Sequence, residues 1–105
     1  MPIIAPRYVN ERAIEAAVRD VEREFSTQVA RIVYSFKEDH TGDPSIYFRI
    51  LVRDEFAPLD HLRELSQSIS LRLMHEAAID ESGLGSYFSF RSVSEQEELK
   101  EPAWD

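Results

Sequence analysis

The sequence predicts a single α+β domain in which two helices cover one face of a three-stranded, mainly antiparallel sheet. Apolar residues recur at helical spacing in two stretches and alternate at every second position in three others. The three glycines and most of the prolines lie between these stretches, as expected of turns that separate elements. The element order is therefore helix-strand-strand-helix-strand, which resembles a split βαβ unit preceded by a helix.

The first helix is predicted to begin at Asn10, after an N-terminal arm of residues 1–9 that contains two prolines. Asn is a favourable N-cap, and Glu11 suits the positive end of a helix. Apolar residues then follow at spacings of three and four: Ile14, Ala17, Val18, Val21 and Phe25. This spacing forms one stripe of a helix, and charged residues occupy the rest of its surface.

Two strands joined by a polar, turn-forming loop are predicted next, over about residues 28–37 and 45–54. Because side chains alternate between the two faces of a strand, the even-numbered residues of both strands face the core. In the first strand these residues are Ala30, Ile32, Tyr34 and Phe36, with Val29 on the opposite side. In the second strand they are Ile46, Phe48, Ile50 and Val52.

The second helix is predicted to start at Pro58 and to run to about residue 82, where Gly83 ends it. The third strand covers residues 86–93 and completes a domain of residues 10–93. Ser94 and Glu97 have capping-box spacing, so a short helix over residues 95–100 is expected within an acidic C-terminal tail, residues 94–105.

The order of the strands follows from the connection between the second and third strands. A helical crossover that spans the hairpin partner predicts the sheet order 2-1-3, with both helices on one face. The alternative order is 1-2-3, in which the second and third strands are adjacent and parallel.

Composition excludes several classes of protein. The chain has 105 residues, of which 43% are apolar and 30% charged, as in ordinary globular domains. No cysteine is present, so disulfides, thiol catalysis and thiolate metal sites are excluded. No apolar run approaches the ~18 residues of a membrane span, and no signal-peptide pattern is visible, so we expect a cytoplasmic protein. The net charge of −8 argues against binding to duplex DNA.

No pattern of catalytic or metal-binding residues is complete. His40 lies among carboxylates in the hairpin loop, but the ligand spacing of a calcium loop is missing. His75 and Glu76 begin the helix motif of zinc proteases, but Ile79 stands where the second histidine is required. Glycine-rich phosphate loops and nucleophile motifs are also missing. We therefore expect a protein that is not an enzyme and has no catalytic residues, metal or cofactor.

The face of the sheet opposite the helices carries the clearest candidate for a functional surface. It combines arginine, tyrosine and aliphatic side chains, the types that are common in protein interfaces. The residues predicted to form this interaction face are Arg31, Val33, Tyr47, Arg49, Leu51, Arg53, Tyr87 and Arg91. Since two helices cover only one side of such a sheet, this face is open, covered by a tail, or covered by another molecule.

Three hypotheses follow. In the first, the face forms a protein interface, either in a homodimer or with a different protein. In the second, Tyr47 and Tyr87 stack on the bases of single-stranded nucleic acid and arginines meet its phosphates. In the third, the acidic tail folds back and Trp104 covers the apolar part of the face.

We expect the first hypothesis to hold, with nucleic-acid binding as the alternative. The protein is then a small interaction module, either a homodimer or a subunit of a larger complex. Its size, acidity and lack of catalytic motifs resemble, in a general way, those of bacterial accessory or antitoxin-like proteins.

Overall fold

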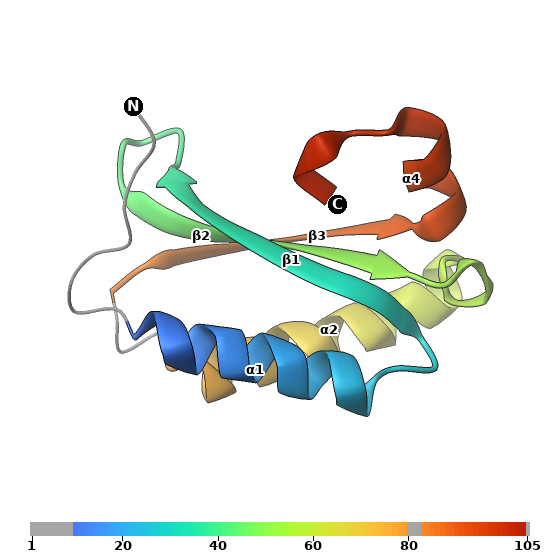
Figure 1. Cartoon of the computed structure of the whole chain (residues 1–105), viewed down its shortest axis with the longest axis horizontal. Coiled ribbons are helices and arrows are strands. Elements are labelled where there is room, and N and C mark those ends of the chain that lie inside the picture. The colour runs from blue at the N-terminus through green and yellow to red at the C-terminus, as the bar shows by residue number, and fades with distance from the viewer. Residues whose placement is uncertain (1–9, 80–82, 105) are drawn as a thin grey trace.

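Two helices lie against one face of a three-stranded sheet, and the C-terminal segment lies against the other (Figure 1). The structure is a computed structural model that describes residues 10–79 and 83–104. The predicted N-terminal arm, residues 1–9, lies outside this range. Along the chain the elements are α1 (Glu11–Glu24), β1 (Val29–Glu38), β2 (Pro44–Val52), η1 (Asp54–Phe56), α2 (Leu59–Glu76), β3 (Gly85–Ser92), α4 (Val93–Leu99) and η2 (Pro102–Trp104). The α+β class and the placement of both long helices on one face are confirmed.

The strand order is β1-β2-β3, so the predicted order 2-1-3 is wrong and the alternative order is right. β1 pairs with β2 antiparallel, whereas β2 pairs with β3 parallel, which makes the sheet mixed rather than mainly antiparallel. The physical reason lies in β2, which is the most apolar strand. Ile46, Phe48, Ile50 and Val52 are each at most 1% exposed. A strand buried to this extent gains most from a central position with a partner on each side.

At the start of β1, a β-bulge reverses the side of the sheet on which two side chains were predicted to lie. Val29 pairs with Val52 and Arg31 pairs with Leu51, so Ala30 is an extra residue in this strand. The bulge turns Val29 into the core and leaves Ala30 exposed, the reverse of the predicted placement. From Ile32 onward the strand alternates as predicted.

The core lies between the sheet and the two long helices. The buried stripe of α1 consists of Ile14, Ala17, Val18 and Val21, as predicted from its spacing. Ile69 and Leu73 of α2 are fully buried against the same sheet face. The rings of Phe48 and Phe88 stack at 5.1 Å across β2 and β3.

The second helix ends earlier than predicted. α2 stops at Glu76, and Ala78 then has a left-handed backbone with φ of +52°. That conformation ends the helix several residues before Gly83. Ile79 and Leu84 are both buried, so burial of the chain after Glu76 competes with continuation of the helix.

The N-cap of the short C-terminal helix lies two residues before the predicted cap, Ser94. The N-cap of α4 is Ser92, whose Oγ accepts a hydrogen bond from Glu95 N at 3.1 Å. Ser94 instead donates through its N and Oγ to the carboxylate of Asp54. The hydrogen bonds from Ser94 lower the pKa of Asp54. A carboxylate distant in sequence thus supplies part of the cap, which local spacing does not show.

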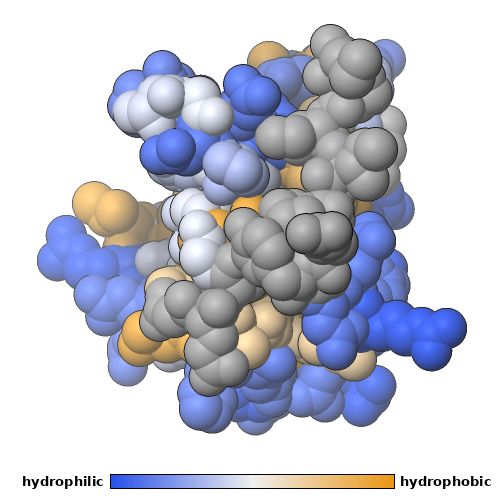
Figure 2. Space-filling view, turned by 90° about the vertical axis from the view of Figure 1, so that its left-hand side faces the viewer, coloured by the Kyte–Doolittle hydropathy of each residue, from blue (hydrophilic) through white to orange (hydrophobic). Residues whose placement is uncertain are grey.

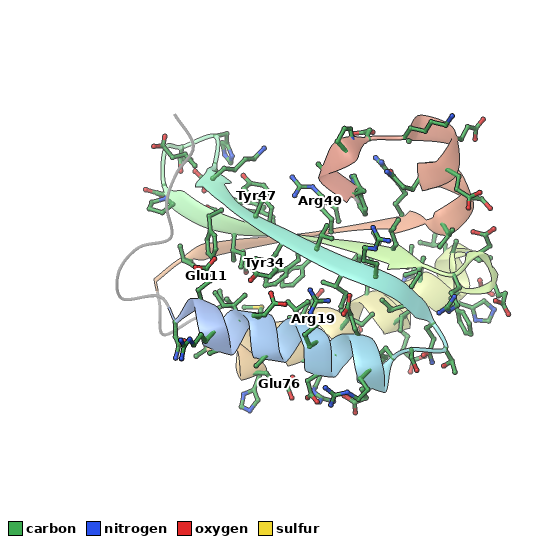
Figure 3. The ribbon with its side chains drawn as sticks, in the orientation of Figure 1. Glu11, Arg19, Tyr34, Tyr47, Arg49 and Glu76 are labelled. Atoms are coloured by element: carbon green, nitrogen blue, oxygen red, sulfur yellow. The ribbon has the colours of Figure 1, made fainter. Side chains whose placement is uncertain are left out.

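A chain of charged side chains joins α1 to the outer edge of β1 (Figure 3). Arg19 bonds to Glu15 Oε1 at 2.7 Å and to Glu22 Oε1 at 2.6 Å. The second oxygen of Glu22 accepts the backbone N–H of Ile32 at 2.7 Å, and the second oxygen of Glu15 accepts the Tyr34 hydroxyl at 2.9 Å. Burial, and next the hydrogen bond to Glu15, raise the pKa of Tyr34 to about 12. The helix therefore satisfies an edge-strand donor that would otherwise lack a partner.

Replacing Glu22 with alanine should destabilise the fold through this edge. The half-buried Ile32 amide loses its acceptor, which costs about 1–3 kcal/mol. Urea unfolding followed by circular dichroism measures the loss. Arg12→Ala, an exposed change on the same helix, is the control and should shift stability by less than about 0.5 kcal/mol. Equal effects of the two variants would contradict a role for the Glu22 contact.

Candidate interaction surface

The sheet face opposite the long helices is divided between a covered half and an open half. α4 and η2 lie over β2 and β3 at one end, and the β1–β2 loop lies at the other (Figure 1). Tyr47 and Arg49 both project from this face, Tyr47 toward the β1–β2 loop and Arg49 nearer to the C-terminal segment (Figure 3). The predicted interaction residues therefore fall into groups with different surroundings.

Arg91 anchors the C-terminal segment on the covered half. It donates to Gln96 Oε1 at 2.8 Å and to Glu101 Oε1 at 3.0 Å. Its guanidinium lies 4.4 Å from the ring centroid of Trp104, a cation–π contact, and Trp104 is only 5% exposed. Gln96 is buried too and donates to the backbone oxygen of Glu101. In this half the acidic tail folds back onto its own sheet.

Two further predicted residues lie beside the C-terminal segment. Leu51 is 8% exposed and belongs to the covered half, whereas Arg31 is exposed. Both line a shallow groove of about 610 Å³ between the sheet and α4. The remaining lining residues are Val93, Gln96, Glu97 and Lys100.

Arg53 lies at the end of the predicted face and shares a groove with Arg31 and Val33. It follows the last residue of β2, and its Nε donates to the backbone oxygen of Ser26 at 3.2 Å. Its side chain therefore supports the loop between α1 and β1.

The open half carries an ordered row of side chains across the three strands. Tyr47 and Tyr87 stack with ring centroids 4.8 Å apart and planes inclined by 14°. The Lys37 ammonium lies 4.7 Å from the centroid of the Tyr47 ring. Arg49 donates to Ser35 Oγ at 2.9 Å. The name open face is used below for Val33, Lys37, Tyr47, Arg49 and Tyr87.

Asp39, in the β1–β2 loop, fixes one end of this row. Its carboxylate accepts hydrogen bonds from the Thr41 amide and hydroxyl, at 2.9 and 2.6 Å, and from the Tyr87 hydroxyl at 2.9 Å. The Thr41 hydroxyl contributes most to lowering the pKa of Asp39 well below its usual range. The same carboxylate raises the pKa of Tyr87. Asp39 thus holds Tyr87 in its stacked position.

Sequence analysis missed two members of this arrangement. Lys37 is two positions after Ser35 and four after Val33, so strand alternation predicts that all three side chains lie on the same face of the sheet. Asp39 appeared only as a loop carboxylate beside His40, because its contact with Tyr87 joins residues 48 positions apart.

The open face is positively charged in an acidic protein. Within residues 10–79 and 83–104, neither Lys37 nor Arg49 forms an ion pair with a carboxylate, whereas Arg91 lies 3.0 Å from Glu101 and 3.9 Å from Glu95. The chain as a whole has a net charge of −8. Among the described residues, the positive charges of Lys37 and Arg49 are therefore not balanced by a bonded carboxylate.

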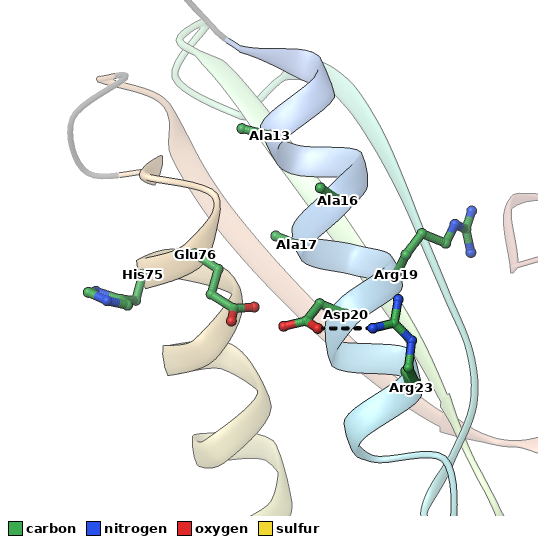
Figure 4. Close-up of a pocket in the computed structure, with 8 residues that line it drawn as sticks. All are labelled: Ala13, Ala16, Ala17, Arg19, Asp20, Arg23, His75 and Glu76. Atoms are coloured by element: carbon green, nitrogen blue, oxygen red, sulfur yellow. Dashed lines mark hydrogen bonds and ion pairs between the residues drawn. The ribbon is translucent and has the colours of Figure 1, made fainter.

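The histidines do not form a catalytic arrangement in the described part of the chain. A wide groove of about 780 Å³ lies between α1 and α2, with His75 and Glu76 at its rim (Figure 4). His75 points away from the groove, while Glu76 points toward Asp20 and bonds to Arg72 at 3.0 Å. Among the described residues no group of three or more His, Asp or Glu side chains could hold a metal ion.

The surface at the end of the molecule near the β1–β2 loop is mostly hydrophilic, with hydrophobic residues in small separate patches (Figure 2). None of the helices in the described ranges is both long and apolar enough to cross a membrane.

Comparison with known proteins found no matching family model, no matching curated protein and no matching solved structure.

Removing the Arg91 side chain should release the C-terminal segment. Trp104 is the only tryptophan of the chain, so its emission reports on this segment alone. In Arg91→Ala the cation–π contact and the bonds to Gln96 and Glu101 are lost, and the emission maximum should move to the red with stronger acrylamide quenching. Far-UV circular dichroism should change little. Unchanged emission would show that Trp104 is held without Arg91.

Lowering the pH should weaken the fold through Asp39. Its pKa is lower in the folded chain than the unfolded value of about 3.9, so its contribution is complete above that pH and declines as the pH falls below it. Urea midpoints between pH 6 and pH 2 should fall more steeply for the wild type than for Asp39→Asn, which cannot ionise at this position. Parallel curves for the two proteins would contradict this role of Asp39.

Proposed function

We propose that the protein is a non-enzymatic protein–protein interaction module whose open face binds an acidic segment of another protein. The observation that carries this proposal is the pair of cations, Lys37 and Arg49, beside the stacked rings of Tyr47 and Tyr87. Tyrosine and arginine are the residue types that contribute most at protein interfaces. Such a module works by binding alone, as expected of an accessory or antitoxin-like subunit, and we place it in the cytoplasm.

The open face is ordered before any partner arrives. Tyr87 is held by Asp39, Tyr47 lies between Tyr87 and Lys37, and Arg49 is hydrogen-bonded to Ser35. Side chains that are already held lose less conformational entropy on binding. This preorganisation favours a specific partner over non-specific attraction.

On the covered half, an arginine of this sheet face already binds an acidic residue of the same chain. There, Glu101 of the tail binds Arg91 on the same sheet face. Lys37 and Arg49 offer positive charge on the open half, and neither forms an ion pair with a carboxylate of the described residues. A partner segment rich in Asp or Glu fits this surface by charge complementarity.

The open face gives less support to single-stranded nucleic acid. Base stacking needs an aromatic ring with a free face. One face of Tyr47 is against Tyr87, and the Lys37 ammonium lies over the ring, so Tyr47 is poorly placed to stack on a base. The net charge of −8 also repels a phosphate backbone.

The test compares wild type with Arg49→Glu in affinity capture from the source cells, followed by reconstitution with the purified partner. The reversed charge should weaken binding by about tenfold or more, and the wild-type affinity should fall as salt rises. Arg63→Glu, on the exposed surface of α2, is the matched control and should bind like the wild type.

Two results would contradict the proposal. One is a partner that binds wild type and Arg49→Glu equally. The other is salt-sensitive binding to a single-stranded oligothymidine that is lost in Arg49→Glu, which would instead support the nucleic-acid alternative.

A further inference from the structure

The two edges of the sheet are protected to very different degrees. At the β1 edge, Glu22 accepts the outward N–H of Ile32, a bulge interrupts the strand after Val29, and Lys37 and Glu38 add charge. These are the devices by which proteins prevent pairing at an edge strand. β3 is the other edge, and its sequence Gly-Ser-Tyr-Phe-Ser-Phe-Arg-Ser contains no proline, lysine or acidic residue. Its pairing with β2 is in continuous register, without a bulge.

Strand alternation shows which β3 residues direct their backbone groups away from the sheet. The N–H of Ile32 points away from β2, so Ile32 and its partner Ile50 form a non-hydrogen-bonded pair, and the next pair, Val33 with Arg49, is hydrogen-bonded. Ile50 therefore directs its backbone groups toward β3. In a parallel pair a residue bonds to the two neighbours of its partner. Ile50 is paired with Phe90, so Phe90 itself faces outward. The outward residues of the central part of β3 are Ser86, Phe88 and Phe90.

These outward backbone groups have no hydrogen-bond partner among the residues that the structure describes. Beside them lies an apolar groove of about 600 Å³ between β3 and α2. Its lining consists of Ser66, Gln67, Ser70, Leu71, Phe88 and Phe90. Leu71 is 67% exposed there, which is unusual for a leucine next to two half-buried aromatic residues.

Residues 86–92 of β3 read nearly the same in reverse, since only Tyr87 and Arg91 differ. Around Ser89 the order is Ser-Tyr-Phe-Ser-Phe-Arg-Ser, so each residue meets a similar or compatible one in an antiparallel copy. The pairs are Ser86 with Ser92, Tyr87 with Arg91, and Phe88 with Phe90. The outward residues Phe88 and Phe90 then face each other as hydrogen-bonded pairs, and no like charges are opposed.

We propose that β3 pairs antiparallel with β3 of a second copy of this chain, in the register centred on Ser89. The two sheets then form one six-stranded sheet, with Phe88 and Phe90 continuing its apolar face and Leu71 of each α2 covering the seam. The interface is symmetric and uses both copies of the same edge. Only the β1 edges remain at the outside, where Glu22 occupies the Ile32 amide, so assembly stops at two chains.

This inference goes beyond the proposed function, because β3 is a different surface from the open face and its occupant is a second copy. The two-fold axis runs perpendicular to the joined sheet. Both open faces therefore lie on the same side of the dimer. A partner with two acidic segments can engage both at once, which raises its apparent affinity.

Charge substitutions at Ser89 test the register. Ser89 is exposed and lies on the proposed axis, where directly opposite Cα atoms are about 4.5 Å apart. Ser89→Lys and Ser89→Glu each oppose two like charges, and each should raise the dimer dissociation constant by about tenfold or more in sedimentation equilibrium. An equal mixture of the two variants should restore a mixed dimer. Ser89→Thr is the control and should remain dimeric.

Amide hydrogen exchange of the full chain identifies the contact. The Phe88 and Phe90 amides should exchange slowly in the wild-type dimer and fast in Ser89→Lys, while the amides of β2 remain protected in both. A wild-type chain that stays monomeric up to millimolar concentration would overturn the inference.

A dimer that Ser89→Lys leaves intact, with fast exchange at Phe88 and Phe90, would overturn it as well and place the interface elsewhere. Neither result would bear on the proposed role of the open face, which the Arg49→Glu comparison tests separately.

Discussion

Burial of β2 is the constraint on which the rest of the structure depends. Four of its side chains, those of Ile46, Phe48, Ile50 and Val52, are removed from water on the helix side, and Leu51 is buried on the other side. A strand with apolar groups on both faces needs a strand on each flank and a layer above and below. β1 and β3 provide the flanks, α1 and α2 the layer on one face, and the C-terminal segment covers part of the other.

The incomplete cover on that second face creates the candidate site. The C-terminal segment contacts Arg91 and lies over Leu51, and it leaves Tyr47 uncovered. The covered half is closed by aromatic and carboxylate groups of the same chain. The open half has similar chemistry, Tyr and Arg, without that cover, and Asp39 holds it in a defined shape. The two sheet edges also differ in how far they are covered. At the β1 edge, Glu22 of α1 accepts a backbone N–H, whereas the outward backbone groups of β3 have no partner in the described chain.

Much of this organisation was predictable because it depends on local periodicity. The stripe of α1, the alternation of β2 and the residues Tyr47, Arg49, Tyr87 and Arg91 on one face follow from spacings of 3.6 and 2. The exceptions have specific causes. A single extra residue at Ala30 reversed the facing of Val29, and a left-handed Ala78 ended α2 early. Asp54 capped α4 from 40 residues away, which no local pattern reveals.

The class of fold, the two faces of the sheet and the type of residue on each follow from local sequence patterns, because these features depend on neighbours a few positions apart. The strand order, the division of the second face and the contacts of Tyr87 with Asp39 and of Arg91 with Trp104 depend on packing between distant segments. Such contacts join distant segments, and their free energy depends on what each segment leaves unburied after the others have packed. A local pattern contains no record of that competition.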